Sequence, residues 1–446
     1  MFSALGRRRP LLLAAGCACA LLAGLWAGRP QAARAVAAPP PRAAAPAEAN
    51  RMQMLAQPDF TKMQAVGRAM FFDRSLSASG AVSCASCHDP AHAYGPPNAL
   101  PVQPGGATGR RLGVRAAPSL RYQQNVPPFT AHHFDDDFDE SVDQGPAGGH
   151  GWDGRASTLH EQAAIPLLAA HEMANASPAA VVARLRAAPY AAQFRDTFGA
   201  DALDDDARGF QWATLALEMF QQDPQQFYPY SSRFDDFLRG KAPLAANEMR
   251  GLALFNDEKK GNCASCHVSE VSANSGAFPA FSDFGFIALG VPRNRALPAN
   301  RDPAFHDLGL CGPDRTDLSG PENAGLCGAF RTPTLRNVAV RQAFFHNGVM
   351  HSLQEVVRFY VTRDLQPQRW YPYPAREGGA HRRYDDLPAQ YAGNVNTDPP
   401  FDRGPGQAPR LSEAEIRDVV AFLHTLTDRD VVATAEAIAR PAKARR

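Results

Sequence analysis

The chain has 446 residues, 45% of them hydrophobic and 20% charged, and its formal net charge is +1. This composition is typical of a globular protein, and the length suggests two or more domains. The balanced charge argues against a nucleic-acid-binding protein held mainly by phosphate contacts. No internal run of 18 apolar residues occurs, which excludes a multi-span membrane protein.

Residues 1–37 have the order of a secretory signal peptide. Arginines at positions 7 to 9 precede an apolar stretch from Leu11 to Trp26, and small-residue sites around Ala35 follow it. An uncleaved membrane anchor is the alternative, but the apolar stretch is short and rich in Gly and Ala. We therefore expect a periplasmic protein, in which residues 38–50 form a flexible leader.

The chain contains two copies of the pattern Cys-Ala-Ser-Cys-His, at Cys84, Cys87 and His88 and again at Cys263, Cys266 and His267. Cys-x-x-Cys-His is typical of c-type haem attachment. The two thiols can reach the two vinyl groups of one porphyrin, and the histidine that follows can ligate the iron. A redox dithiol would lie in a βαβ context that is absent here, and a zinc site would have to join two distant pairs. The sequence therefore predicts two covalently bound haem c groups.

Apolar residues at helical spacing predict one helix before each haem motif and several more along the chain. The additional helices are expected at residues 157–170, 178–197, 206–222, 352–363 and 412–427. Ser177 is the expected N-cap of the second of these, and Ser412 and Glu415 form a capping box for the last. No run of alternating strands occurs.

The expected fold is therefore mainly α, with two c-type cytochrome-like haem domains and long irregular loops. We place the domains at residues 51–235 and 240–430, followed by a solvated tail at 431–446. Cys311 and Cys327 are expected to form a disulfide with a structural role, because an exported protein rarely keeps two free thiols.

Further motifs follow one another in a fixed order: Gly67-Arg68-Ala69-Met70-Phe71-Phe72-Asp73, Trp152-Asp153-Gly154-Arg155, Glu172-Met173, Phe330-Arg331-Thr332-Pro333-Thr334-Leu335-Arg336-Asn337 and Phe345-His346-Asn347-Gly348. Together with the haem motifs they resemble the bacterial dihaem cytochrome c peroxidases and their MauG relatives. The resemblance covers most of residues 55–428. It implies that one haem meets hydrogen peroxide while the other stores or passes electrons.

The resemblance also implies roles for individual residues near the haem on Cys84 and Cys87. Glu172 would serve as a general acid–base, with Gln162 as a second polar residue, and Trp152 would relay electrons between the haems. Each residue also has a plainer interpretation. Glu172 could be an acid at a helix end, Gln162 an amide on a helix surface, and Trp152 a packing side chain. Arg331 and Arg336 could pair with haem propionates or lie on a solvated surface.

The sequence departs from the family pattern at the axial ligands. Many of these peroxidases have a second histidine about sixteen residues past the first proximal one, where this chain has Pro104. We therefore expect an open first haem. At the second haem, the peroxidases have a methionine ligand and MauG a tyrosine, and the matching residue here is Tyr360. Met350 is an alternative ligand, but it matches no family position.

The usual calcium site of the family is altered as well. An alanine, Ala116, follows Arg115 where the family has an asparagine, and Arg341 and Ala343 replace the usual Thr and Pro. Calcium is therefore doubtful in this protein.

The predicted function is that of a periplasmic dihaem c-type peroxidase of the MauG-like type that reduces hydrogen peroxide. Its electrons would come from a small redox protein (a cytochrome c or a cupredoxin) or from a protein substrate. One alternative is an ordinary cytochrome c peroxidase in which Tyr360 is not a ligand. The other is a non-catalytic electron carrier, which Glu172 and the open first haem disfavour. The sequence does not indicate an oligomeric state.

Overall fold

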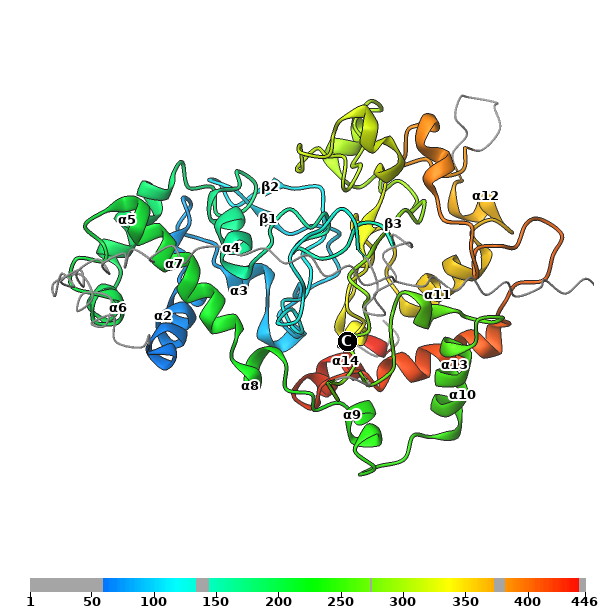
Figure 1. Cartoon of the computed structure of the whole chain (residues 1–446). Coiled ribbons are helices and arrows are strands. Elements are labelled where there is room, and N and C mark those ends of the chain that lie inside the picture. The colour runs from blue at the N-terminus through cyan, green and yellow to red at the C-terminus, as the bar shows by residue number, and fades with distance from the viewer. Residues whose placement is uncertain (1–58, 134–143, 273–274, 373–381, 441–446) are drawn as a thin grey trace, which may run out of the picture. The chain divides into compact units, whose positions relative to one another are not determined.

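Helices joined by long irregular segments make up the protein in a computed structural model that describes residues 59–133, 144–272, 275–372 and 382–440 (Figure 1). The mainly α fold class is thereby confirmed. The predicted signal peptide and leader lie outside the described residues. No helix within the described ranges is both long and apolar enough to cross a membrane.

The N-terminal half contains the helices α2 (Phe60–Phe72), α3 (Cys84–Cys87), α4 (Leu159–Leu168), α5 (Pro178–Ala187), α6 (Ala191–Phe198), α7 (Asp206–Gln221) and α8 (Pro224–Phe227). The C-terminal half contains α9 (Arg233–Leu238), α10 (Ala246–Asn256), α11 (Leu353–Thr362), α12 (Pro367–Trp370), α13 (Glu413–His424) and α14 (Val432–Ala439). Two short antiparallel pairs join β1 (Pro104–Gly105) to β2 (Arg111–Leu112) and β3 (Phe286–Ile287) to β4 (Phe330–Arg331).

Most of the predicted helices are confirmed, but two predictions are wrong. The single helix expected over 178–197 is divided into α5 and α6, because Pro189 lacks the N–H that a continuous helix needs. The segment after α13 is not simply a solvated tail, since α14 forms there and Val431 and Ala435 are buried. The predicted caps at Ser177 and Ser412 are present, each accepting a backbone N–H from the first turn of its helix.

The same helix-pair arrangement occurs twice (Figure 1): α2 packs along α7, and α10 packs along α13. A glycine lies at each crossing. A carbon added to Gly67 would lie 1.9 Å from the carbonyl oxygen of Ala216, and one added to Gly251 would lie 2.0 Å from that of Asp418. Glycine therefore allows the close approach of the two helices in each half.

Replacing Gly67 by alanine should destabilise the fold. The added methyl group would overlap the backbone of α7, which cannot rotate away, and overpacking of this kind costs about 1–3 kcal/mol. Urea unfolding of Gly67→Ala should show that loss. The control is Gly325→Ala at an exposed position with no neighbour within 4 Å, which should leave the midpoint unchanged.

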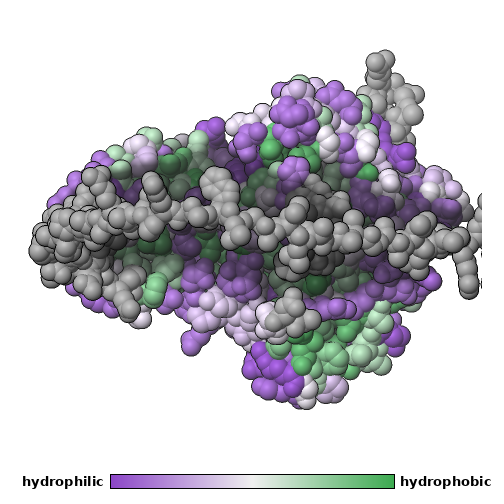
Figure 2. Space-filling view, in the orientation of Figure 1, coloured by the Kyte–Doolittle hydropathy of each residue, from purple (hydrophilic) through white to green (hydrophobic). Residues whose placement is uncertain are grey.

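Buried apolar side chains form two large clusters, one for each half. The first draws on α2, α4, α5, α6 and α7, and the second on α10, α11, α13 and α14. On the face seen in Figure 2, apolar surface gathers at the lower right, in the region of α10. Each Cys-x-x-Cys-His motif follows the first helix of its cluster.

Two candidate haem sites

The first Cys-x-x-Cys-His segment lies on α3 and the turn after it. Nδ1 of His88 is 3.1 Å from the carbonyl oxygen of Tyr94. Because a carbonyl only accepts hydrogen bonds, Nδ1 carries the hydrogen and Nε2 keeps its lone pair for a metal. Burial lowers the pKa of His88, which favours the neutral ring that metal ligation requires.

The second segment has the same arrangement. Nδ1 of His267 lies 2.9 Å from the carbonyl oxygen of Phe281, so its Nε2 is likewise left with a lone pair. Burial lowers the pKa of His267 as well. Both histidines are therefore oriented by a backbone carbonyl directly after a pair of cysteines.

The cysteines themselves are not activated. Burial raises the pKa of Cys84 and of Cys263 to about 12, so these thiols are not ionised near neutral pH. Redox dithiols and zinc ligands act as thiolates, whose pKa is lowered by their surroundings. This environment disfavours both alternatives to haem attachment.

Equivalent loops support the two histidines. The loop that supports His88 is Ala117-Pro118-Ser119-Leu120-Arg121, and the loop that supports His267 is Thr332-Pro333-Thr334-Leu335-Arg336. In each loop a hydroxyl donates to the carbonyl just before the one that binds the histidine: Ser119 to Ala93, and Thr334 to Ala280, both at 2.6 Å. The backbone that orients His88 is thus held in the same way as the backbone that orients His267.

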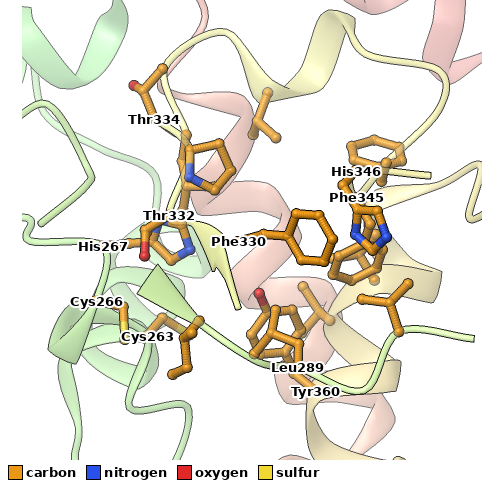
Figure 3. A pocket seen from close by; sticks show the side chains of 18 of the residues that line it. Cys263, Cys266, His267, Leu289, Phe330, Thr332, Thr334, Phe345, His346 and Tyr360 are labelled. Atoms are coloured by element: carbon orange, nitrogen blue, oxygen red, sulfur yellow. The ribbon is translucent and has the colours of Figure 1, made fainter. Parts of the chain in front are cut away.

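A deep, largely apolar pocket lies beside His267 (Figure 3). Cys263, Cys266 and His267 occupy one side of it, Leu289 and Tyr360 lie below, and Phe345 and His346 are at the far side. A porphyrin attached to the two cysteines would fill this space, with His267 against its iron.

Tyr360, on α11, lines the same pocket. Its ring contacts Phe345 and Phe401, with centroids 6.2 and 5.1 Å away, and none of the described residues hydrogen-bonds to its hydroxyl. Burial raises the pKa of Tyr360. Met350 is 2% exposed and packs in the core, and it is not among the residues that line the pocket. Of the two candidate ligands, the structure brings only Tyr360 to the pocket.

Two arginines, the buried Arg331 and the half-buried Arg341, line the pocket without a carboxylate partner among the described residues. Arg331 donates to the carbonyl oxygen of Gly151 and to the side chain of Gln123, and its Nη1 has no hydrogen-bond partner there. Arg341 donates only to the carbonyl oxygens of Ala117 and Ala343. Burial lowers the pKa of both guanidinium groups to about 10.

A buried cation without a counter-charge is costly unless a bound anion compensates it. The two propionates of a haem are anions of the right kind for Arg331 and Arg341, so the residues fit this cofactor. Arg336 differs, because both of its Nη atoms pair with the buried carboxylate of Asp235, at 3.0 and 3.1 Å. The alternative of a solvated surface is wrong for both arginines of the motif, which are 6% and 2% exposed.

Arg341 also bears on the calcium prediction. Its guanidinium lies against the carbonyl oxygens of Ala117 and Ala343, in the two stretches where the family pattern is altered. Within the described ranges, no three His, Cys, Asp or Glu side chains cluster so as to hold a metal ion. The positive charge of Arg341 at these carbonyls opposes the binding of a calcium ion there. That this protein lacks the calcium of its family stays a prediction.

Glu172 follows α4 and lies near the first haem motif. Burial and, after it, the charge of Glu172 raise the pKa of Cys87 to about 11. The Glu172 side chain is 40% exposed, and its Oε1 lies 3.6 Å from Nε2 of His171. The backbone is tied down, since the Gly106 N–H donates to the Glu172 carbonyl at 2.7 Å. A carboxylate that is partly exposed and close to the haem motif is well placed to exchange protons with a small substrate.

Gln162 and Pro104 are the two other positions that the sequence singled out beside the first haem. Gln162 lies on α4, is half-buried, and has no side-chain hydrogen bond with any described residue. Pro104 belongs to β1, in the short hairpin whose next residues pack against the backbone of Glu172. A proline cannot ligate iron, so this position provides no sixth ligand.

Histidines near the first motif are engaged elsewhere. His92 lines the pocket of the second motif, and its Nδ1 lies 2.8 Å from a carboxylate oxygen of Asp89. His150 is buried, and burial with the nearby charge of Arg331 lowers its pKa to about 4. These positions agree with an open first haem, which stays a prediction.

Trp152 lies against the segments that precede both supporting loops. Its side chain lines the pocket of the second motif, and its Nε1 donates to the carbonyl oxygen of Ala116 at 2.8 Å, two residues before Pro118 of the first loop. The Trp152 carbonyl accepts from the backbone N–H of Arg331 at 2.9 Å. Trp152 is therefore hydrogen-bonded to the residue just before each supporting loop, to Ala116 through its indole and to Arg331 through its backbone carbonyl.

His346 is a pocket residue for which the sequence predicted no role. Its ring stacks on Phe330 with centroids 3.6 Å apart and planes 8° from parallel, and its Nε2 is buried without a partner among the described residues. Burial lowers the pKa of His346 to about 4. The signal was present in the motif Phe345-His346-Asn347-Gly348. Elsewhere, Cys311 and Cys327 form a disulfide.

Comparison with known proteins places the chain in context. Residues 61–243 match the family described as di-haem cytochrome c peroxidase. The methylamine utilization protein MauG of Paracoccus denitrificans is 33% identical over 84% of this chain and 90% of its own. The cytochrome c551 peroxidase of Nitrosomonas europaea is 27% identical over 67% and 73%. The crystal structure of the diheme peroxidase BthA from Burkholderia thailandensis has 42% identity and a TM-score of 0.75, covering 84% and 88%.

Fold and site together define an oxidoreductase with two haem cofactors. Two equivalent histidines, each after a cysteine pair, and two arginines without a carboxylate partner fit that class. The chain belongs to the family of dihaem cytochrome c peroxidases that includes MauG, and it is a peroxidase.

Proposed function

We propose that this protein is a MauG-like dihaem peroxidase that works in the periplasm and reduces hydrogen peroxide to water. One haem would be bound through thioethers to Cys84 and Cys87, and the other to Cys263 and Cys266. The observation that carries the proposal is the pair of carbonyl-oriented histidines, each directly after two cysteines. One haem domain would span residues 51–235 and the other 240–430, a division supported by the two hydrophobic clusters.

Haem iron, when bound, supplies the redox chemistry of peroxide reduction, in which H₂O₂ takes up two electrons and two protons to give two waters. His88 and His267 would hold the irons through Nε2. The carboxylate of Glu172 would accept a proton from one peroxide oxygen and return it to the other. Its partial exposure supports this role, because the proton must ultimately be exchanged with solvent.

Electrons would pass between the two sites by way of Trp152, and Tyr360 would ligate the second haem through its hydroxyl oxygen. The first role is supported by the hydrogen bonds of Trp152 to Ala116 and Arg331, which directly precede the two supporting loops. The pocket position of Tyr360 and the unengaged hydroxyl support the second. Gln162 is the least supported of the proposed catalytic residues.

The donor would be a small redox protein or the side chains of a protein substrate. Export to the periplasm would bring the chain to the compartment where haem attachment and the Cys311–Cys327 disulfide are chemically favoured.

Optical and EPR spectra of the purified protein, recorded before and after peroxide, test the proposal. We expect two haems per chain that stay attached on denaturation, one of them high-spin, and a rapid spectral change with peroxide. Turnover should then be measured with reduced cytochrome c, a reduced cupredoxin and a small-molecule donor. A chain that carries one haem, or two that do not respond to peroxide, would contradict the proposal.

Tyr360→Phe should change the second haem alone. The substitution keeps the ring that packs against Phe345 and Phe401 and removes only the oxygen that would bind iron. Resonance Raman bands of an iron-bound phenolate should vanish, while the high-spin signal of the first haem persists. Met350→Leu is the matched control and should leave both spectra unchanged. A wild-type spectrum without phenolate bands, together with a change at the second haem in Met350→Leu, would point to Met350 instead.

A further inference from the structure

Asp428 lies at the point where the supporting loops of the two haem motifs meet. It follows α13 and is fully buried. One carboxylate oxygen accepts the hydroxyl of Tyr122 at 2.7 Å, and the other accepts the side-chain amide of Asn337 at 2.6 Å. Its charge is compensated by the buried Arg121, whose Nη1 lies 3.0 Å away.

Tyr122 and Asn337 occupy equivalent positions in the repeat. Each directly follows the Leu-Arg pair that ends its loop, and each has a left-handed backbone, with φ of 61° and 60°. Such a backbone is uncommon for residues other than glycine, so it recurs here for a structural reason. In both halves, this conformation accompanies a side chain that binds the same carboxylate.

A short chain of hydrogen bonds leads from Asp428 to the first histidine. Tyr122 is two residues after Leu120, whose backbone N–H donates to the carbonyl oxygen of Tyr94 at 3.1 Å. The same carbonyl binds Nδ1 of His88. A displacement of the loop end therefore changes the group that orients the ring.

A corresponding chain leads to the second histidine. Asn337 directly follows Arg336, whose Nε donates to the carbonyl oxygen of Pro279 at 2.7 Å. Two residues later, the carbonyl of Phe281 binds Nδ1 of His267. Asp428 also donates its own backbone N–H to the Asn337 side chain, at 2.7 Å, which fixes this contact from both directions.

We propose that Asp428 is a positioning residue shared by both haem sites, which holds the two histidine-supporting loops in register and links the ligand fields of the two irons. The inference rests on the proposed ligation by His88 and His267. The hydrogen bond at the second ring nitrogen tunes a histidine ligand, so one buried side chain that sets both bonds affects both irons. Its negative charge additionally favours the oxidised, more positive state at each.

The test uses the haem-loaded full chain and measures the midpoint potential of each haem and the iron–histidine stretching frequency. Asp428→Asn keeps the size of the side chain and removes its charge. Both potentials should rise, and both stretching frequencies should shift. Asp430→Asn is the matched control, because Asp430 also pairs with Arg121, at 2.6 Å, but has a side chain that is 53% exposed and reaches neither Tyr122 nor Asn337.

Variants that change only one loop distinguish a residue shared by both haem sites from a general loss of stability. Tyr122→Phe should shift the first haem only, and Asn337→Ala the second haem only. These two variants decide the matter even where Asp428→Asn fails to fold. Shifts of both haems by each single-loop variant, or a shift of only one haem by Asp428→Asn, would overturn the inference. Failure of the proposed function is seen separately, as a wild-type protein that lacks two histidine-ligated haems.

Discussion

Replacing Glu172 by glutamine should reduce the peroxidase rate by roughly 10²- to 10⁴-fold, the usual contribution of a positioned general acid–base. Glutamine keeps the shape of the side chain but cannot take up and return a proton. The loss corresponds to about 3–5 kcal/mol of transition-state stabilisation. Steady-state turnover of a reduced donor with peroxide measures it, at equal haem content.

The control for this substitution is Glu161→Gln. Glu161 lies in the first turn of α4, and its carboxylate accepts the backbone N–H groups of Ser157 and Thr158 in a capping box. The Glu161 side chain is exposed and its contacts are with the backbone at the start of the helix, so the variant should keep its rate. Gln162→Ala tests the weaker candidate beside it. A Glu172→Gln enzyme within twofold of wild type would remove Glu172 from the mechanism.

Local features of the sequence determine the parts of the fold that could be predicted. Helices with clear caps and apolar spacing, such as α7 and α13, depend on neighbouring residues and are present as expected. Pro189 indicates the interruption between α5 and α6, but the apolar spacing continues across this proline and favoured a single helix. The short helix α14 was missed, because its stability depends on burial of Val431 and Ala435 by distant parts of the chain.

The candidate site also has a part that the sequence predicts and a part that only the structure reveals. Both haem motifs are contiguous in sequence, so the cysteines and histidines could be named without a structure. Arg331 and Arg336 look alike within one motif, yet only Arg336 is neutralised, by Asp235 about a hundred residues earlier. The lack of a carboxylate partner for Arg331 within the described ranges, like the position of Asp428 between two loops, is a property of tertiary contacts that no local pattern contains.

Acid should destabilise the folded protein through its buried histidines. Burial lowers the pKa of His150 and of His346 to about 4, whereas a histidine in the unfolded chain has a pKa near 6.5. Between these values the unfolded chain binds protons that the folded chain cannot, so the free energy of unfolding decreases as pH falls. Above pH 6.5 both states are neutral and the contribution is constant. Each histidine accounts for roughly 3 kcal/mol over the full interval.

Asp386 acts in the opposite sense. Burial raises its pKa to about 7 even though Arg293 lies 2.9 Å away, so the folded chain binds an extra proton below that pH. The total pH dependence therefore mixes both signs, and a comparison of variants is needed to isolate the histidines. In His150→Gln, the groups that remain titrate as in wild type and cancel in the difference.

Guanidinium unfolding of wild type and His150→Gln at pH 8, 6.5, 5 and 4 makes that comparison. At pH 8 the two proteins differ only by the packing cost of the substitution, which serves as the internal reference. As pH falls to 4, wild type should lose roughly 3 kcal/mol more than the variant, because only wild type has a neutral imidazole that burial prevents from ionising. His346→Gln should behave in the same way. A difference that stays constant from pH 8 to pH 4 would mean that water reaches these rings and that they titrate freely in the folded state.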